Sequence, residues 1–310
     1  RMPGIDTVEK IATVLDVSAA WLSYGGEPVR RFLNFKPARG FDGLARAARL
    51  EATLQGTGGH IDQSYLYSDP LNAQRYLEIA KNYRGLPLKE AAAAIEHRCQ
   101  EPLSVVALGC GHARHETELV ENLVRHEPDP DSESSLEFYL VDSSISLLTE
   151  GYRYASDYLA RYDVPITAIE GDFAELPSFS DCFNVRGPRR KVFTLIGYTI
   201  ANLDNEISFL REGLLVATRG DFLLLDFGTA DTKLKKTKRA TEDPVSKLLA
   251  SGATPRNNRH LAFLAGPVTR HFGDAVTMEV SAVNDAGAIP KSYAIECWVN
   301  VMTPAGPKRF

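Results

Sequence analysis

The chain has 310 residues, a formal net charge of −5 and a pI of about 5.9, a balance that argues against a surface built to neutralise nucleic-acid phosphates. No apolar run approaches the roughly twenty residues that span a bilayer, so no membrane contact is expected. Hydrophobic content of 44%, charged content of 24% and four scattered cysteines without C-x-x-C spacing favour a globular protein of the reducing cytoplasm over a disulfide framework or a zinc site.

The N-terminal segment, residues 1 to 28, has the pattern of two short helices. Apolar residues recur at helical spacing from Ile5 to Leu15, Ser18 suits the cap of a second helix and Gly25 suits its end. This segment resembles the last two helices of a Cro/C1-type helix-turn-helix domain, in which the recognition helix comes earlier. The resemblance implies a DNA-binding module whose groove-reading half lies outside this chain, so that DNA is a partner only through that missing half.

The next part of the chain is expected to connect this module to a larger domain. Gly and Pro are frequent between residues 29 and 59, which predicts a linker with one helical stretch from Leu44 to Leu54. Further helices are expected over Pro70 to Arg84 and Leu88 to Cys99. We therefore predict three parts, namely a helical remnant over 1–28, a linker over 29–59 and the main domain over 60–310.

A buried strand and a glycine turn form the first candidate ligand-binding feature of the main domain. The apolar run from Leu103 to Leu108 stops at Gly109-Cys110-Gly111, and a helix is expected from about His115. Glycine has no Cβ, so the backbone can turn tightly there and approach a ligand closely, and the small Cys110 side chain fits between the two glycines. A strand, a glycine turn and a helix N-terminus form the start of a nucleotide-binding α/β unit.

The next two predicted strands end in groups suited to an adenosine-type ligand. Leu136 to Val141 runs into Asp142 and Ser143, and a carboxylate at this strand end accepts both ribose hydroxyls. Ile166 to Ile169 is followed by Asp172 and Phe173, where an acid can accept the exocyclic amine of adenine and an aromatic ring can cover the base.

Two more apolar segments, Lys191 to Gly197 and Phe222 to Phe227, complete the parallel part of the sheet. The chain then contains two alternating segments, Thr277 to Val283 and Tyr293 to Val299, which predict an antiparallel hairpin. The predicted fold class is α/β, with a mostly parallel, seven-stranded, Rossmann-like sheet that the C-terminal hairpin closes, plus the small N-terminal helical remnant.

This order of strands and strand ends resembles that of class I methyltransferases that use S-adenosylmethionine. The hairpin, and the absence of a third glycine after Gly111 in a G-x-G-x-x-G pattern, separate it from dinucleotide dehydrogenases. The runs from Phe193 to Leu203 and from Gly220 to Asp226 are similar to the F-L-G-S-T-I-G-N-L and G-D…L-L-L-x-x-D parts of the signature of the histidine-specific Nα-methyltransferases. The type member of that family makes the trimethylated histidine precursor of ergothioneine. The resemblance implies S-adenosylmethionine as cofactor and S-adenosylhomocysteine as product.

The resemblance also assigns candidate site residues. Asn202 matches the Asn with which the family holds its amino acid, and Tyr198, Tyr65 and Tyr67 are expected to line the acceptor site beside it. No side chain is assigned to catalysis, because in-line attack on a sulfonium methyl depends mainly on positioning and exclusion of water. No metal site is expected, because His112 and His115 lack H-E-x-x-H spacing and the cysteines lack C-x-x-C spacing. The residues expected at the cofactor are Gly109, Cys110, Gly111, Asp142, Ser143, Asp172, Phe173 and Ile196.

The sequence leaves three functions open. The first is a methyltransferase acting on a small amine or amino-acid-like molecule and fused to a regulator module, with a homodimer left open. The second is a regulator that senses S-adenosylmethionine or another metabolite without turnover, because Ala107 stands where the family has an acid. The third, a nucleic-acid methyltransferase, is disfavoured by the absence of an N-P-P-Y motif. The basic run from Lys233 to Arg239 is interpreted as a solvated loop or lid.

Overall fold

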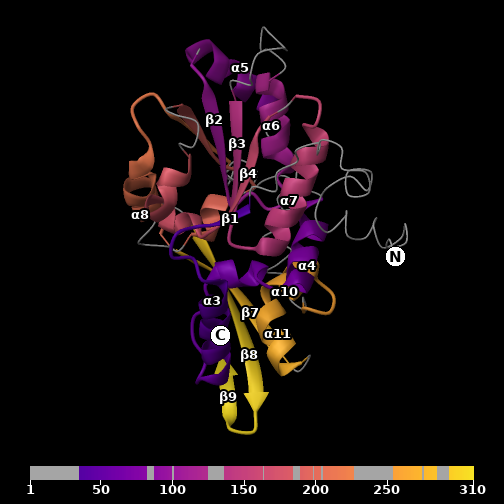
Figure 1. Cartoon of the computed structure of the whole chain (residues 1–310). Helices are drawn as coiled ribbons and strands as arrows, with labels where there is room; N and C mark the ends of the chain where they lie inside the picture. The colour runs from indigo at the N-terminus through magenta and orange to yellow at the C-terminus, as the bar shows by residue number, and fades with distance from the viewer. Residues whose placement is uncertain are drawn as a thin grey trace, which may run out of the picture.

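The computed structural model describes most of the chain from residue 35 onwards, in ranges that fall into two sheets with their helices (Figure 1). The predicted helix-turn-helix remnant over 1–28, Tyr198 and the basic run from Lys233 to Arg239 lie outside the described residues. The described ranges are 35–81, 87–99, 101–124, 136–162, 164–183, 189–197, 199–203, 205–226, 254–273, 276–284 and 293–310.

The larger sheet has six parallel strands in the order β1-β4-β3-β2-β5-β6. Every residue of the two central strands, β2 and β3, is buried, as expected for apolar runs covered on both faces. The strand order reverses between β2 and β5, and ligands of such sheets bind outside the carboxyl ends of the strands at this point. The six strands are β1 (Phe35–Pro37), β2 (Leu103–Leu108), β3 (Leu136–Asp142), β4 (Ile166–Glu170), β5 (Arg190–Leu195) and β6 (Phe222–Leu225).

Helices cover both faces of this sheet (Figure 1). Alternate residues of a strand point to opposite faces, so Phe138 packs with one set of helices while Tyr139 packs with the other. The first set is α5 (Leu88–Arg98), α6 (Arg114–Val124) and α7 (Ile145–Tyr158). The second set is η2 (Phe173–Phe183), α8 (Glu206–Glu212) and η4 (Gly213–Val216).

The smaller sheet is antiparallel and has the strand order β7-β8-β9, namely β7 (Val276–Asn284), β8 (Tyr293–Thr303) and β9 (Gly306–Arg309). It lies below the parallel sheet in Figure 1, beside α3 (Gly43–Gln55) and α11 (Gly266–Phe272). Leu54 of α3 and Val268 of α11 are buried against Val299 and Val301 of β8, which forms a core separate from that of the parallel sheet.

Four further short elements come from distant parts of the sequence. They are η1 (Gln63–Tyr67), α4 (Pro70–Ala80), η3 (Thr199–Asn202) and α10 (Arg259–Leu264). The Asn72 side chain on α4 is fully buried, and its Nδ2 donates to the carbonyls of Leu66 and Phe263 at 2.7 and 3.0 Å. This amide therefore joins η1, α4 and α10 into one unit beside the parallel sheet.

The five predicted parallel strands are confirmed as β2 to β6, and the Rossmann-like fold class with them. Two expectations need correction. The predicted hairpin forms as β7 and β8, but it belongs to the smaller sheet, because one of its faces packs on α3 and α11. The described parallel sheet therefore has six strands instead of the seven expected. The segment 29–59 does not act only as a linker, because β1 pairs with the edge strand β4 and α3 buries Leu54.

Candidate functional site

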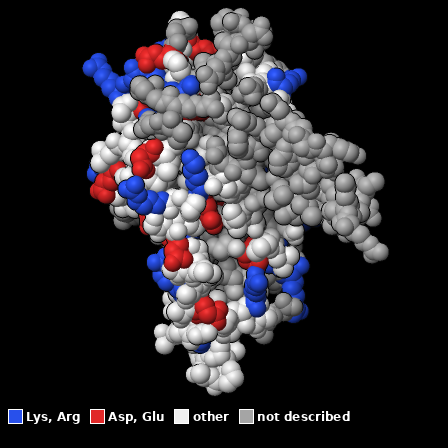
Figure 2. Space-filling view, in the orientation of Figure 1, with Lys and Arg blue, Asp and Glu red and all other residues white. Residues whose placement is uncertain are grey.

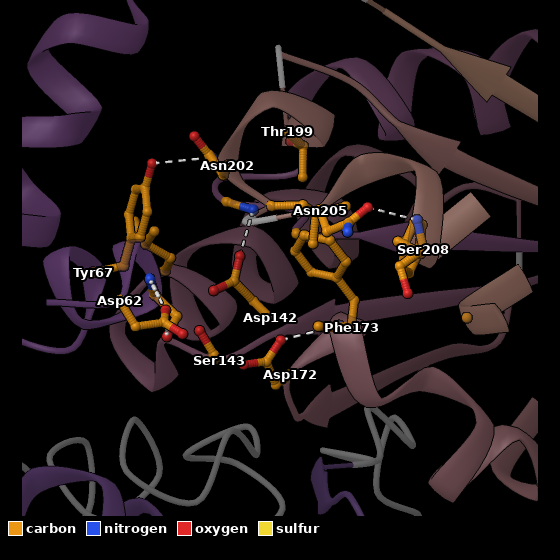
Figure 3. Close-up of a pocket in the computed structure, with 18 of the residues that line it drawn as sticks. Asp62, Tyr67, Asp142, Ser143, Asp172, Phe173, Thr199, Asn202, Asn205 and Ser208 are labelled. Atoms are coloured by element: carbon orange, nitrogen blue, oxygen red, sulfur yellow. Dashed lines mark hydrogen bonds between the residues drawn. The ribbon is translucent and has the colours of Figure 1, made fainter. Parts of the chain in front are cut away.

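A cavity of about 290 Å³ lies at the carboxyl ends of β2, β3 and β4, the edge at which the sequence analysis expects a ligand (Figure 3). No described helix is both long and apolar enough to cross a bilayer, and no group of described side chains has the composition of a metal site. The cavity is lined by Asp62, Ser64, Tyr67, Tyr76, Gly109, Gly111, Asp142, Ser143, Leu147, Asp172, Phe173, Ala174, Thr199, Asn202, Leu203, Asn205, Ser208, Phe209, Glu212 and Gly213.

The glycine turn after β2 forms the floor of the cavity. Gly109 and Gly111 have φ of 63° and 52°, a region that residues with a Cβ rarely adopt. A Cβ on Gly109 would lie 2.5 Å from Thr199 Cγ2 and 3.0 Å from Phe173 Cε1, so the turn also needs glycine for space. Cys110 between them is buried in the core, and its N–H donates to the Val141 carbonyl at 3.1 Å.

The Asp142 carboxylate at the end of β3 is held by two backbone donors. Its Oδ2 accepts the N–H of Gly111 at 2.9 Å and its Oδ1 accepts the N–H of Ser144 at 2.8 Å. Burial raises the pKa of Asp142 to about 6, against the lowering effect of these hydrogen bonds, so the group is mostly ionised at neutral pH. Each oxygen keeps a lone pair with which it can accept a ligand hydroxyl, and Ser143 lines the cavity beside it.

The Asp172 carboxylate and the Phe173 ring follow β4 and line the next part of the cavity. Asp172 Oδ1 accepts the N–H of Ala174 at 3.0 Å, and Oδ2 pairs with Arg46 Nη1 at 3.2 Å. The Phe173 ring meets Phe209 of α8 edge to face, with ring centroids 5.7 Å apart. An acceptor and a flat apolar surface are therefore fixed side by side, as the recognition of an aminated aromatic base requires.

A polar and aromatic group closes the opposite side. Asn202 Nδ2 donates to the Tyr67 hydroxyl at 3.3 Å, and Figure 3 shows the two side chains pointing toward each other. The Tyr67 ring meets Tyr76 at 5.1 Å and Phe263 at 5.2 Å between centroids. Burial raises the pKa of both tyrosines far above the ordinary value for a phenol, so both hydroxyls are neutral donors at physiological pH.

Most of the predicted site residues meet at this cavity. The lining contains Gly109, Gly111, Asp142, Ser143, Asp172, Phe173, Tyr67 and Asn202. Three predicted residues do not line it. Cys110 and Ile196 are buried in the core, and the Ile196 carbonyl accepts a hydrogen bond from the Thr199 hydroxyl at 2.6 Å. The Tyr65 ring packs on the Arg46 guanidinium instead.

The part of the lining that comes from elements other than strand ends was not predicted from the sequence. Asp62 and Ser64 lie at the start of η1, Tyr76 lies on α4, and the α8 side of the cavity includes Ser208 and Glu212. The one available signal was an acid before a short polar stretch at Asp62, which is a common capping pattern and indicates no ligand by itself.

The charge of the cavity is one-sided. Four described lining residues carry an ionisable carboxyl group, Asp62, Asp142, Asp172 and Glu212, and the described lining includes no Lys, Arg or His. On α6, burial raises the pKa of Glu116 to about 8, so that group is largely neutral at pH 7. A ligand in this cavity is favoured when it is cationic or neutral.

No protein-family model matches the chain, and no curated protein matches it. Among solved structures, it is similar to a sugar N-methyltransferase from Streptoalloteichus, at 12% identity over 76% of this chain and 74% of that one, with a TM-score of 0.35. It is also similar to a magnesium protoporphyrin IX methyltransferase from Synechocystis with bound SAH, at 16% identity over 83% of this chain and 94% of that one, with a TM-score of 0.34. A third similar structure is that of an amino pentose methyltransferase from Micromonospora echinaspora with bound SAM, at 13% identity over 76% of this chain and 78% of that one, with a TM-score of 0.33.

Because these TM-scores are below 0.5, the fold class rests on the strand order and on the place of the cavity in the sheet. Parallel strands reverse their order between β2 and β5, and the glycine turn and the β3 carboxylate meet at the resulting crevice. The described chain therefore has a Rossmann-like α/β fold of the kind that class I methyltransferases use.

Proposed function

We propose that this chain is an S-adenosylmethionine-dependent methyltransferase that acts on a small amine or amino-acid-like molecule. The observation that carries the proposal is the Asp142 carboxylate, held by the Gly111 N–H at the mouth of the glycine turn. In this position it can accept the ribose hydroxyls, while Asp172 accepts the adenine amine and Phe173 covers the base. The order of these groups along the crevice matches the order of the parts of the cofactor.

The acceptor is expected at Tyr67 and Asn202. The Asn202 amide both donates and accepts, which suits an amino-acid amine and carboxylate. The carboxylates in the lining favour a cationic or neutral acceptor over an anion, and an amine must lose a proton before it attacks the methyl group. An in-line attack in a water-poor cavity then needs chiefly correct placement of the amine.

A nucleic-acid substrate is disfavoured by charge. The described lining is acidic, and on the face shown in Figure 2 the described Lys and Arg side chains are interspersed with Asp and Glu. Nucleic-acid binding depends on a basic surface that replaces the counterions of the phosphates. The fused DNA-binding module, the cytoplasmic location and a homodimer stay predictions from the sequence.

The second candidate is a sensor that binds the cofactor without turnover. Ala107, two residues before Gly109, is fully buried and offers no carboxylate to the ligand, although the resemblance leads us to expect an acid there. A site with this change can retain the ribose and base contacts while it holds the methionine part less firmly.

Calorimetric titration with S-adenosylmethionine and S-adenosylhomocysteine tests the proposal. We expect binding of both, and a loss of affinity of at least about tenfold in Asp142→Ala, because hydrogen bonds to a charged group contribute about 1.5–3 kcal/mol each. Asp181→Ala, which removes an exposed carboxylate from the surface, serves as the matched control and should bind like the parent. Absence of binding to either ligand would overturn the proposal.

Turnover distinguishes the two candidates. Transfer of a labelled methyl group from S-adenosylmethionine into small amines of a metabolite extract supports the enzyme. Binding without transfer into that extract supports the sensor, and transfer into DNA or RNA contradicts both.

A further inference from the structure

Arg46 is a largely buried cation just behind the cavity wall, on a helix within the segment predicted as a linker. It lies in the first turns of α3, and its side chain is 12% exposed. The guanidinium is held between two aromatic rings, at 5.3 Å from the centroid of Phe41 and 5.1 Å from that of Tyr65. A charge so enclosed is held in one place by its partners.

Both hydrogen-bonding partners of this guanidinium line the cavity. Nη1 pairs with Asp172 Oδ2 at 3.2 Å, and Nη2 donates to the Ser64 hydroxyl. Ser64 in turn donates its hydroxyl and its N–H to Asp62 Oδ1, at 2.5 and 2.7 Å. A continuous chain of contacts therefore runs from Asp172 through Arg46 and Ser64 to Asp62, and Figure 3 shows the two carboxylates on the same side of the cavity.

Two contacts fix the orientation of the Asp172 carboxylate. Its Oδ1 already accepts the Ala174 N–H and its Oδ2 is fixed by Arg46, so the carboxylate cannot rotate without losing one of them. A planar guanidinium can bind a carboxylate and a hydroxyl at once, whereas a lysine ammonium is a single point charge on a flexible stem. The remaining lone pairs of Asp172 thus keep a constant orientation towards a ligand.

We propose that Arg46 is a positioning residue that sets the base specificity of the cavity by orienting the Asp172 carboxylate towards the exocyclic amine of adenine. This inference rests on the proposed function, because it needs an adenosine ligand at Asp172. It assigns to α3 a part in ligand selection, although Arg46 itself lies behind the residues that touch the ligand.

Two ligands that differ only in the base test this role. S-adenosylhomocysteine offers an amine to Asp172, whereas S-inosylhomocysteine offers a carbonyl oxygen, which a carboxylate repels. The parent protein should bind the adenine ligand roughly 10- to 100-fold more tightly, the range expected for a hydrogen bond to a charged group. In Arg46→Gln this ratio should fall by about fivefold or more, and Arg46→Lys should retain part of it.

The ratio of two affinities on one variant is independent of how much of that variant is folded. Arg39→Gln is the matched control, since Arg39 pairs with Asp181 on the surface at 3.4 Å with its side chain 80% exposed, and it should leave the ratio unchanged. Equal weakening of both ligands in Arg46→Gln would mean that Arg46 only supports the fold, and this result overturns the inference. A parent protein that binds both ligands equally also overturns it, whereas a parent that binds neither overturns the proposed function.

Discussion

Substitution of Gly109 by alanine tests whether the glycine turn must approach its neighbours as closely as the structure indicates. The new Cβ would lie 2.5 Å from Thr199 Cγ2 and 3.0 Å from Phe173 Cε1. Gly109 also has a φ of 63°, so the alanine would be strained by its backbone even in open space. Gly40 provides the matched control, because it has a φ of 80° and no atom within 4 Å of its added Cβ.

The two substitutions share one cost and differ in the other. An alanine in the left-handed region costs about 1–2 kcal/mol, which should be the whole effect of Gly40→Ala. Gly109→Ala adds overpacking against a side chain and a ring, which typically costs a further 1–3 kcal/mol or so. We therefore expect the free energy of unfolding to fall by about 2–5 kcal/mol in Gly109→Ala.

Urea unfolding followed by circular dichroism gives the two free energies, and titration with S-adenosylhomocysteine gives the effect on binding. Because the Cβ displaces the Phe173 ring, Gly109→Ala should also lose affinity, whereas Gly40→Ala should bind like the parent. Equal destabilisation by the two alanines would refute the close approach at Gly109.

Three further predictions concern buried polar groups and the buried thiol. Asn72→Ala leaves two backbone carbonyls without their donor, so the free energy of unfolding measured in urea should fall by about 2–4 kcal/mol. A loss below about 1 kcal/mol would contradict the role of this amide in joining η1, α4 and α10. Burial raises the pKa of Asp142 to about 6, so calorimetry should show weaker binding of S-adenosylhomocysteine as the pH falls from about 8 to about 5, with no such change in Asp142→Asn. Binding of S-adenosylhomocysteine that does not change with pH would show that the carboxylate is not a ligand. Because the raised pKa lets the folded state hold a proton that the unfolded state has lost, the contribution of Asp142 to the free energy of unfolding should rise as the pH falls through 6. Cys110 is buried and the pKa of its thiol lies well above the ordinary value, so brief iodoacetamide treatment should leave it unmodified while the partly exposed Cys99 reacts, as mass spectrometry would show. Comparable labelling of both cysteines in the folded protein would be inconsistent with the packing of the turn.

The parallel strands could be predicted because their signal is local. Central strands covered on both faces are nearly continuous apolar runs, and Leu103–Leu108 is one, with each of its residues buried. β1 gave no such signal, since it has three residues, ends in Pro37 and is recognisable only through its pairing with β4. The hairpin was recognised from its alternation, but alternation does not state which sheet a hairpin joins. That choice depends on packing with α3 and α11, which are distant in the sequence.

The same distinction separates the predicted and the missed parts of the site. Asp142 and Asp172 follow strands directly, so the strand positions bring them to one edge of the sheet. Tyr65 and Tyr67 are two residues apart in η1, where one ring packs on Arg46 and the other enters the cavity. No local pattern decides between them, and none reveals Arg46 as the partner of Asp172, because that contact joins residues 126 positions apart.

The one-sided charge of the lining has a consequence for the order of events in the proposed methyl transfer. S-adenosylmethionine carries a sulfonium and an ammonium against a single carboxylate, whereas the product has lost the sulfonium charge. A cavity whose described lining has carboxylates and no Lys, Arg or His attracts the first more strongly than the second. Transfer of the methyl group would then itself loosen the hold on the spent donor and favour its exchange for a fresh molecule. Added salt, which screens this attraction, should reduce the preference for the donor over the product.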